Sequence, residues 1–179
     1  AAEHLAGSAA AFMPQMNELA LRAGAVHTHF ANPTGLTQSD HYTTAADLAK
    51  IALYGLRNED FSRIVGLEKK TVRWEEPAGK MVVAENTNEL LGHYPGADGV
   101  KTGYTQAAGE CLVASAKRDG VELVAVVMHA ADDRRFLEAG QLLDYGFFFF
   151  LLQKAADRDE LVHSIHVPCG TTYQLPCPP

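Results

Sequence analysis

Apolar and polar positions follow a helical period in the first third of the chain. Apolar side chains within residues 1–23 form a helical stripe, and Gly24 marks its end. Thr44 and Asp47 have the three-residue spacing of a capping box, and an apolar helical face follows them. Residues 58–65 predict another short helix.

After these helices the pattern indicates turns and strands. Residues 25–30 predict a short extended segment, and residues 32–35 supply the proline and glycine of a turn. Strand-like runs follow at residues 70–74, 80–84, 98–103, 109–117 and 121–129. A hairpin signal at residues 118–120 joins the last two of these runs.

The end of the chain predicts one more helix and one more strand. Asp132 or Asp133 can cap a helix that runs to about Tyr145. Residues 161–167 predict a last strand, and a proline-rich tail follows it. Helices, then antiparallel strands, then a helix is an α+β order, and it differs from the βαβ alternation of a Rossmann fold.

Composition limits the classes of protein to consider. The chain has 179 residues, of which 47% are hydrophobic and 21% charged, so a folded globular protein is expected and disorder is excluded. Fifteen Lys and Arg against 22 Asp and Glu give a net charge of −7, which argues against a nucleic-acid partner. No apolar run is long enough to span a bilayer. The chain begins with Ala1 rather than Met, so we expect that an upstream segment has been removed.

Three cysteines are too few for a disulfide scaffold. Cys111 lies in an apolar run and predicts a buried small hydrophobe. Cys169 and Cys177 are close in sequence, so they could pair in an oxidising compartment or remain two free thiols.

The most informative motif is Lys101-Thr102-Gly103. A phosphate-binding loop is excluded, because that motif needs glycine directly before the lysine and Val100 occupies that place. Lys-Thr-Gly is also the third element of a serine acyl-transfer set that contains Ser-x-x-Lys and Ser-x-Asn. In that chemistry Lys101 is a fixed cation for a substrate's terminal carboxylate, and the Thr102 hydroxyl donates a hydrogen bond to it.

The next two positions complete the proposed chemistry. Gly103 has no side chain, so a substrate backbone could lie alongside the strand and pair with it. The backbone N–H of Tyr104 would then point at the carbonyl under attack, as one donor of an oxyanion hole. A bare Lys-Thr-Gly is a weak signal by itself, and the alternative is a solvent-facing lysine on an edge strand.

Several segments, in order, resemble the serine D-alanyl-D-alanine carboxypeptidases, the low-molecular-mass penicillin-binding proteins. They are Thr28-His-Phe-Ala-Asn-Pro-Thr-Gly-Leu36, His41-Tyr-Thr-Thr-Ala-Ala-Asp-Leu-Ala49, Asn86-Thr-Asn-Glu-Leu-Leu91, residues 98–120 and Leu142-Leu-Asp-Tyr-Gly-Phe147. The resemblance covers roughly residues 1–165. It implies an α+β, β-lactamase/transpeptidase-like fold with an antiparallel sheet flanked by helices. It also implies that residues 1–154 are the C-terminal part of the catalytic domain and residues 155–179 a linker with the start of a truncated β-rich domain.

The same resemblance implies an activity and its partners. The family hydrolyses the terminal D-Ala–D-Ala bond of peptidoglycan stem peptides through a serine acyl-enzyme, without a metal or organic cofactor, and β-lactams inhibit it. The substrate lies outside the cytoplasmic membrane, so an exported protein, periplasmic or on the cell surface, is expected. Members of the family often carry a terminal membrane-anchoring helix, so the full-length protein could also be membrane-associated. By resemblance Lys101, Thr102 and Gly103 bind the substrate and the Tyr104 N–H helps to form the oxyanion hole. Arg135 matches an arginine that helps to hold the carboxylate; the alternative is a plain exposed helix arginine.

The chain departs from the family at the nucleophile. It has five serines, none with lysine three residues on or asparagine two residues on. By resemblance, the nucleophilic serine and its lysine would lie upstream of Ala1. We therefore expect no acyl-enzyme on this chain alone. We also expect either a complementing N-terminal fragment or self-association, because strands missing from the sheet leave an edge open.

The sequence also allows two other functions and a metal site. His27 and His29 would share one face of a strand, and with His41 they could form a zinc site, but the segment fits the family without a metal. The chain could also be a non-catalytic binding remnant of the fold, or a β-lactamase, which shares the Lys-Thr-Gly element.

Overall fold

The computed structural model describes residues 1–75, 79–149, 161–166 and 172–176. The chain divides into two compact units, residues 1–149 and 150–179, and each is described by itself. The predicted boundary at residue 154 lies outside the described residues and stays a prediction. Cys169 and Cys177 also lie outside the described residues, so their pairing stays a prediction.

The first unit begins with two helices in place of the single one predicted. The helices are α1 (Ala2–Ala6) and α2 (Ala9–Arg22). Gly7 has a left-handed φ of 79° and ends α1, and the Ser8 hydroxyl then accepts a hydrogen bond from the Ala11 N–H at 3.1 Å. The prediction of one helix over residues 1–23 is therefore wrong at the Gly-Ser pair, where a stop signal and a start signal stand side by side.

Two further helices begin where their capping residues predict. α3 (Ala45–Leu56) follows Thr44, whose hydroxyl accepts from the Asp47 N–H at 3.1 Å. α4 (Glu59–Val65) follows Asn58, whose side chain caps the helix in the same way. Both predictions are confirmed.

The segment between α2 and α3 forms a loop rather than a strand. Only one isolated bridge, between His29 and Tyr42, remains of the extended piece predicted over residues 25–30. The turn at residues 32–35 is confirmed, because the Asn32 side chain accepts hydrogen bonds from the N–H groups of Thr34 and Gly35.

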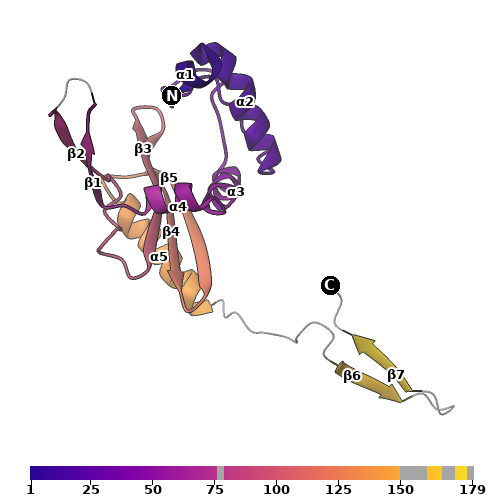
Figure 1. The fold of residues 1–179 in the computed structure, drawn as a ribbon. Helices are drawn as coiled ribbons and strands as arrows, with labels where there is room; N and C mark the ends of the chain where they lie inside the picture. Colours follow the sequence, from indigo (N-terminus) through magenta and orange to yellow (C-terminus); the bar gives the residue numbers. More distant parts are fainter. Residues whose placement is uncertain (76–78, 150–160, 167–171, 177–179) are drawn as a thin grey trace. The chain divides into compact units, whose positions relative to one another are not determined.

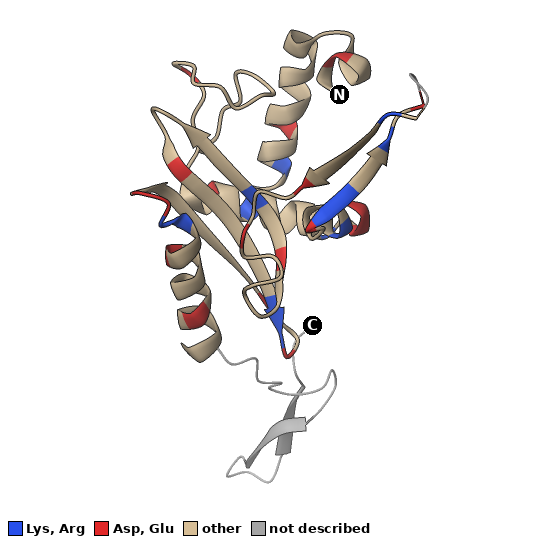
Figure 2. Ribbon diagram, turned by 90° about the vertical axis from the view of Figure 1, so that its left-hand side faces the viewer, with Lys and Arg blue, Asp and Glu red and all other residues tan. Residues whose placement is uncertain are grey.

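Five strands follow in this unit and form two sheets (Figure 1). The strands are β1 (Lys69–Arg73), β2 (Met81–Glu85), β3 (Ala97–Thr105), β4 (Gly109–Arg118) and β5 (Val121–Ala130). β1 and β2 form an antiparallel hairpin with basic residues on β1, seen in blue in Figure 2. The other three form an antiparallel sheet in the order β3-β4-β5, so β3 is at one edge of it.

The sheet lies between helices, with the main core on one face. α5 (Arg135–Phe149) packs on β4 and β5 (Figure 1). There Leu143 of α5 meets Leu112 of β4, and each is at most 1% exposed. Burying one such leucine fully contributes about 1.5–3 kcal/mol. Successive strand residues point to opposite faces, so Val113 faces the other way, toward α3.

A polar cluster fixes α5 to the loop before β3. The Tyr94 hydroxyl donates to Asp144 at 2.8 Å, and the Arg118 guanidinium lies over the rings of Tyr94 and Phe147, 4.5 Å from each centroid. Burial, the hydrogen bond to Asp144 and the charge of Asp144 raise the pKa of Tyr94 to about 12, against the opposing effect of Arg118.

α5 starts later than its sequence predicts. Asp132 and Asp133 have positive φ values of 39° and 57°, whereas an N-cap residue has an extended backbone. Neither residue therefore caps the helix, which begins at Arg135 and continues past Tyr145 to Phe149. None of the helices in the described residues is long and apolar enough to cross a membrane.

The second unit contributes one antiparallel strand pair. β6 (Leu161–His166) matches the predicted strand, and β7 (Thr172–Pro176) pairs with it. β7 lies in the tail that the sequence analysis left without structure, because its prolines disfavour strands in general. Helices with antiparallel sheets confirm the α+β class.

Candidate active site

The Lys101-Thr102-Gly103 motif lies on the edge strand β3. The Lys101 side chain is anchored by a hydrogen bond from its Nζ to the Thr102 carbonyl oxygen at 2.7 Å. Lys101 is opposite Val113 of β4 in the register, so both side chains lie on the face that looks toward α3. Lys101 is exposed, as expected for a solvent-facing lysine on an edge strand, but it also lies at the border of a cavity.

That cavity is large and almost wholly apolar. Its volume is about 670 Å³, and its walls come from α2, α3, α4, β3 and β4. A soluble monomer seldom leaves an apolar hollow of this kind uncovered unless something binds there. Residues that line it include Met16, Leu19, Leu48, Ile51, Val113 and Lys101.

The Thr102 hydroxyl is held by a residue that the sequence analysis did not single out. Thr102 and Thr87 share a hydrogen bond between their hydroxyls. Next to Thr87, the Asn88 side chain is 2% exposed and donates to the Gly99 carbonyl of β3 at 2.7 Å. The loop that contains Thr87 and Asn88 therefore lies against β3 beside the motif. The two contacts join residues that are separated by 15 and by 11 positions in the sequence, so no local pattern predicts them.

Gly103 has open space where a side chain would go. A Cβ built there would lie 3.8 Å from the Cβ of Cys111, an ordinary van der Waals distance, and meet nothing closer. The sheet itself does not require glycine at this position. Cys111 is half-buried rather than buried, which corrects the prediction made for it.

Tyr104 follows the motif with a side chain that is 65% exposed. Tyr104 lies opposite Glu110 in the register of β3 and β4. Glu110 in turn forms an ion pair with Arg135, and the two side chains are 18% and 15% exposed. The Arg135 guanidinium also lies 4.9 Å from the centre of the Phe136 ring. Arg135 is thus not a plain exposed helix arginine, and it stands at the Tyr104 end of β3.

A loop reaches the same end of β3. The Thr37 hydroxyl donates to the Thr105 hydroxyl at 3.2 Å, which brings residues 30–41 beside the end of the strand. The His29–Tyr42 bridge closes this loop at its base with two backbone hydrogen bonds of 2.9 and 3.1 Å.

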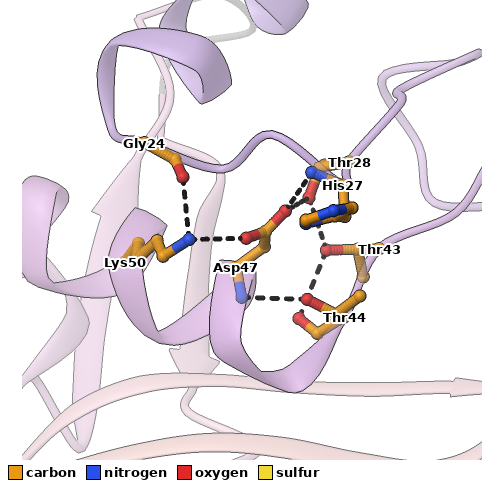
Figure 3. Close-up of polar contacts among 7 residues, drawn as sticks. All are labelled: Gly24, His27, Thr28, Thr43, Thr44, Asp47 and Lys50. Atoms are coloured by element: carbon orange, nitrogen blue, oxygen red, sulfur yellow. Dashed lines mark hydrogen bonds and ion pairs between the residues drawn. The ribbon is translucent and has the colours of Figure 1, made fainter.

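Asp47, at the start of α3, organises the backbone beside the cavity wall (Figure 3). Its carboxylate accepts from the His27 N–H at 2.6 Å, from the Thr28 hydroxyl at 3.0 Å and from Lys50 Nζ at 3.0 Å. Burial tends to raise the pKa of Asp47, but these three hydrogen bonds and the charge of Lys50 outweigh it and hold that pKa below its usual value. Lys50 also donates to the Gly24 carbonyl, so one carboxylate ties α3 to the turn after α2.

The suggested histidine metal site does not form. His29 Nδ1 contacts the Asp40 carbonyl, and His41 Nδ1 accepts from the Ala31 N–H. Among residues 1–75, 79–149 and the two later strands, no three His, Cys, Asp or Glu side chains lie close enough together to hold a metal ion. That no cofactor is needed stays a prediction.

Comparison with known sequences identifies relatives over most of the chain. The family model for peptidase S11, D-alanyl-D-alanine carboxypeptidase, matches residues 1–132. The D-alanyl-D-alanine carboxypeptidase DacF of Bacillus subtilis (strain 168) is 37% identical over 94% of this chain and 43% of its own length. A D-alanyl-D-alanine carboxypeptidase of Streptomyces sp. (strain K15) is 34% identical over 76% of this chain and 48% of its own length. The chain thus spans slightly less than half the length of these relatives.

Solved structures agree with this result. The Streptomyces K15 DD-transpeptidase superposes with a TM-score of 0.74 at 33% identity, over 78% of this chain and 55% of that one. The D-alanyl-D-alanine carboxypeptidase from Mycobacterium tuberculosis H37Rv gives 0.75 at 31% identity, over 83% and 57%. The expected transpeptidase-like fold is therefore confirmed. Sequence and fold together establish that the chain belongs to the D-alanyl-D-alanine carboxypeptidase family.

Proposed function

We propose that this chain supplies the carboxylate-binding half of a serine-type D-Ala-D-Ala carboxypeptidase. One observation carries the proposal: Lys101 is anchored on an exposed edge strand, at the border of an apolar cavity, with Thr102 and Gly103 beside it. A fixed ammonium and a hydroxyl next to a free strand edge suit a peptide that ends in a carboxylate.

Each site residue then has a defined task. Lys101 and Thr102 bind the terminal carboxylate, and Gly103 leaves room for the peptide backbone along β3. The Tyr104 N–H stabilises the oxyanion of the tetrahedral intermediate. Arg135 has one Nη engaged by Glu110, and within the part of the chain that the structure describes its buried Nε has no hydrogen-bond partner. Because Glu110 offsets the charge of Arg135, the guanidinium N–H groups would act on the substrate carboxylate as hydrogen-bond donors more than as a net positive charge.

The nucleophile comes from a segment outside this sequence. A serine oxygen attacks the carbonyl carbon of the penultimate D-Ala, and the C–N bond to the terminal D-Ala breaks. The terminal D-Ala leaves with a proton on its nitrogen, and water then hydrolyses the serine ester. We assign the apolar cavity to the segment that carries this serine, because it borders Lys101 and because the relatives have a further half of comparable length.

The substrate class follows from the family. We propose stem peptides of peptidoglycan that end in D-Ala-D-Ala as substrates, with β-lactams as inhibitors. Those peptides lie outside the cytoplasmic membrane, so the protein would act there, in the periplasm or on the cell surface. The two relatives compared by sequence are carboxypeptidases by name, which favours this function over a β-lactamase or a non-catalytic remnant.

Fluorescent penicillin tests the proposal directly. The chain would be incubated with the probe alone and together with the separately produced first half of the Bacillus subtilis relative. We expect no covalent label on the chain alone, and label on the added half only when wild-type chain is present. The variant Lys101→Met should abolish that label, whereas Lys117→Met, an exposed lysine on β4, should not.

Two results would contradict the proposal. Label on the chain alone would place a nucleophile within it. A stable dimer in sedimentation velocity that gives no label with the added half would show that a second copy covers the cavity instead.

A further inference from the structure

We propose that Thr87 is a positioning residue of the carboxylate site: it sets the direction of the Thr102 hydroxyl proton. This inference rests on the proposed function, because it concerns how Thr102 meets the substrate carboxylate. It starts from the hydrogen bond between the two hydroxyls and the way the loop holds Thr87 in place.

Either hydroxyl can donate in this bond, and the direction decides what Thr102 presents to a substrate. A threonine hydroxyl has one proton to donate and two lone pairs that accept. Lys101 Nζ lies 3.5 Å from Thr102 Oγ1 and can only donate to it, which engages one lone pair. If Thr87 donates to the second lone pair, the Thr102 proton is left for an incoming carboxylate. If Thr102 donated to Thr87 instead, its oxygen would turn a lone pair toward the carboxylate and repel it.

The surrounding loop is built to keep Thr87 in position. The Asn86 side chain donates to the carbonyls of Val65 and Leu67, at 3.1 and 3.0 Å. Asn86 also accepts from the Asn88 N–H at 3.0 Å, and the buried Asn88 bonds to Gly99. Thr87 itself is exposed, so no packing explains its contact with Thr102. Asn86 and Asn88 therefore hold the Thr87 hydroxyl beside Thr102, although the Thr87 side chain does not pack in the core.

A carboxylate acceptor also strengthens the chain of hydroxyls. Hydrogen bonds in series polarise one another, so a donor that feeds Thr102 makes the Thr102 proton a better donor. Removing the Thr87 hydroxyl frees Thr102 to rotate, and its proton loses its preferred direction. A neutral C-terminal amide gains less from that proton, because hydrogen bonds to ionised acceptors are about twice as strong.

Binding of a short peptide with two different C-termini tests this inference. The full chain, labelled with 15N, would be titrated with N-acetyl-D-alanyl-D-alanine and with its C-terminal amide, and the backbone signals of residues 101–104 followed. For Thr87→Val we expect the Kd of the free acid to rise about three- to tenfold, and the Kd of the amide to rise clearly less. Thr87→Ser should restore the affinity, and Thr71→Val, an exposed threonine on β1, should behave as wild type.

The outcomes separate this inference from the proposed function. If wild-type chain binds acid and amide equally, the proposed function fails and this inference falls with it. If wild type prefers the acid but Thr87→Val keeps that preference in full, the function stands and Thr87 has no positioning role. If Thr87→Val weakens the binding of acid and amide by the same factor, Thr87 has only a structural role.

Discussion

Arg135, the first residue of α5, is ion-paired with Glu110, the second residue of β4. Both side chains are more than four-fifths buried, and Glu110 is opposite Tyr104 in the register of β3 and β4. The pair therefore links the start of the last helix of the first unit to the end of the strand that carries the substrate motif. It holds a candidate binding residue and stabilises the sheet at the same time.

The first prediction concerns this pair. Arg135→Gln leaves the Glu110 carboxylate largely buried without its cation, so the free energy of unfolding should fall by about 2 kcal/mol, as measured by urea denaturation at pH 7. Arg134→Gln is the matched control, because Arg134 and Glu138 form a more exposed pair at 3.7 Å. Its effect should stay within about 0.5 kcal/mol. Equal effects of the two variants would contradict the role given to Arg135.

The second prediction concerns acid stability. The pKa of Asp47 is lower in the folded chain than in the unfolded one, so its contribution is present above the unfolded value of about 4 and is lost as the pH falls through the folded value. Asp47→Asn should be less stable than wild type at pH 7, and the difference should shrink as the solution is acidified. Urea midpoints from pH 7 to pH 2 measure this.

The control for Asp47 is another carboxylate paired on a helix. Asp60 forms an ion pair with Arg63 at 2.8 Å, with both side chains mostly exposed. Asp60→Asn should therefore follow the wild-type profile at every pH. An Asp47→Asn profile parallel to wild type down to pH 2 would show that Asp47 does not supply the acid-sensitive part of the stability.

The third prediction concerns alkaline pH. The pKa of Tyr94 is raised to about 12 in the folded chain, so its contribution is complete below pH 10 and is lost as the pH rises toward 12. Tyr94→Phe removes the hydrogen bond to Asp144 and should cost about 1 kcal/mol at pH 7. Ultraviolet absorbance should show one fewer tyrosine ionising near pH 12 in this variant. A titration unchanged by the substitution would refute the assignment.

The fourth prediction separates folding from binding at Gly103. The space around Gly103 admits a side chain, and valine favours strands, so Gly103→Val should change the free energy of unfolding by less than about 1 kcal/mol. The same valine occupies room that the peptide backbone needs, and it should weaken binding of N-acetyl-D-alanyl-D-alanine about tenfold. If binding stays intact in this variant, the peptide does not lie along β3 at this residue.

Local signals predicted much of this fold. Thr44 and Asn58 cap helices because a side-chain oxygen beside a free N–H group is a purely local arrangement. The hairpin between β4 and β5 is equally local, and the Lys-Thr-Gly motif could be recognised from its neighbours in the sequence. Where local signals conflicted, prediction failed. Gly7 and Ser8 divide one helical stripe, and Asp132 and Asp133 have backbone angles that caps do not adopt.

The site depends on contacts that no local pattern contains. Thr87 meets Thr102, and Thr37 meets Thr105, across 15 and 68 residues. The sequence pattern identified Asp47 as part of a capping box. Its carboxylate also accepts a hydrogen bond from the His27 N–H, 20 residues away in the sequence. Threonine and asparagine in loops are common, so only the fold distinguishes those that reach β3. The apolar cavity has the same origin, since α2, α3 and the sheet form its walls together.

Lys101 is the residue to which we assign binding of the substrate's terminal carboxylate. Isothermal titration of the wild-type chain and of Lys101→Met with N-acetyl-D-alanyl-D-alanine and its C-terminal amide tests this assignment most directly. We expect that wild type prefers the free acid and that Lys101→Met loses this preference while binding the amide as before. Equal binding of acid and amide by wild type, or an acid preference that survives in Lys101→Met, would contradict it.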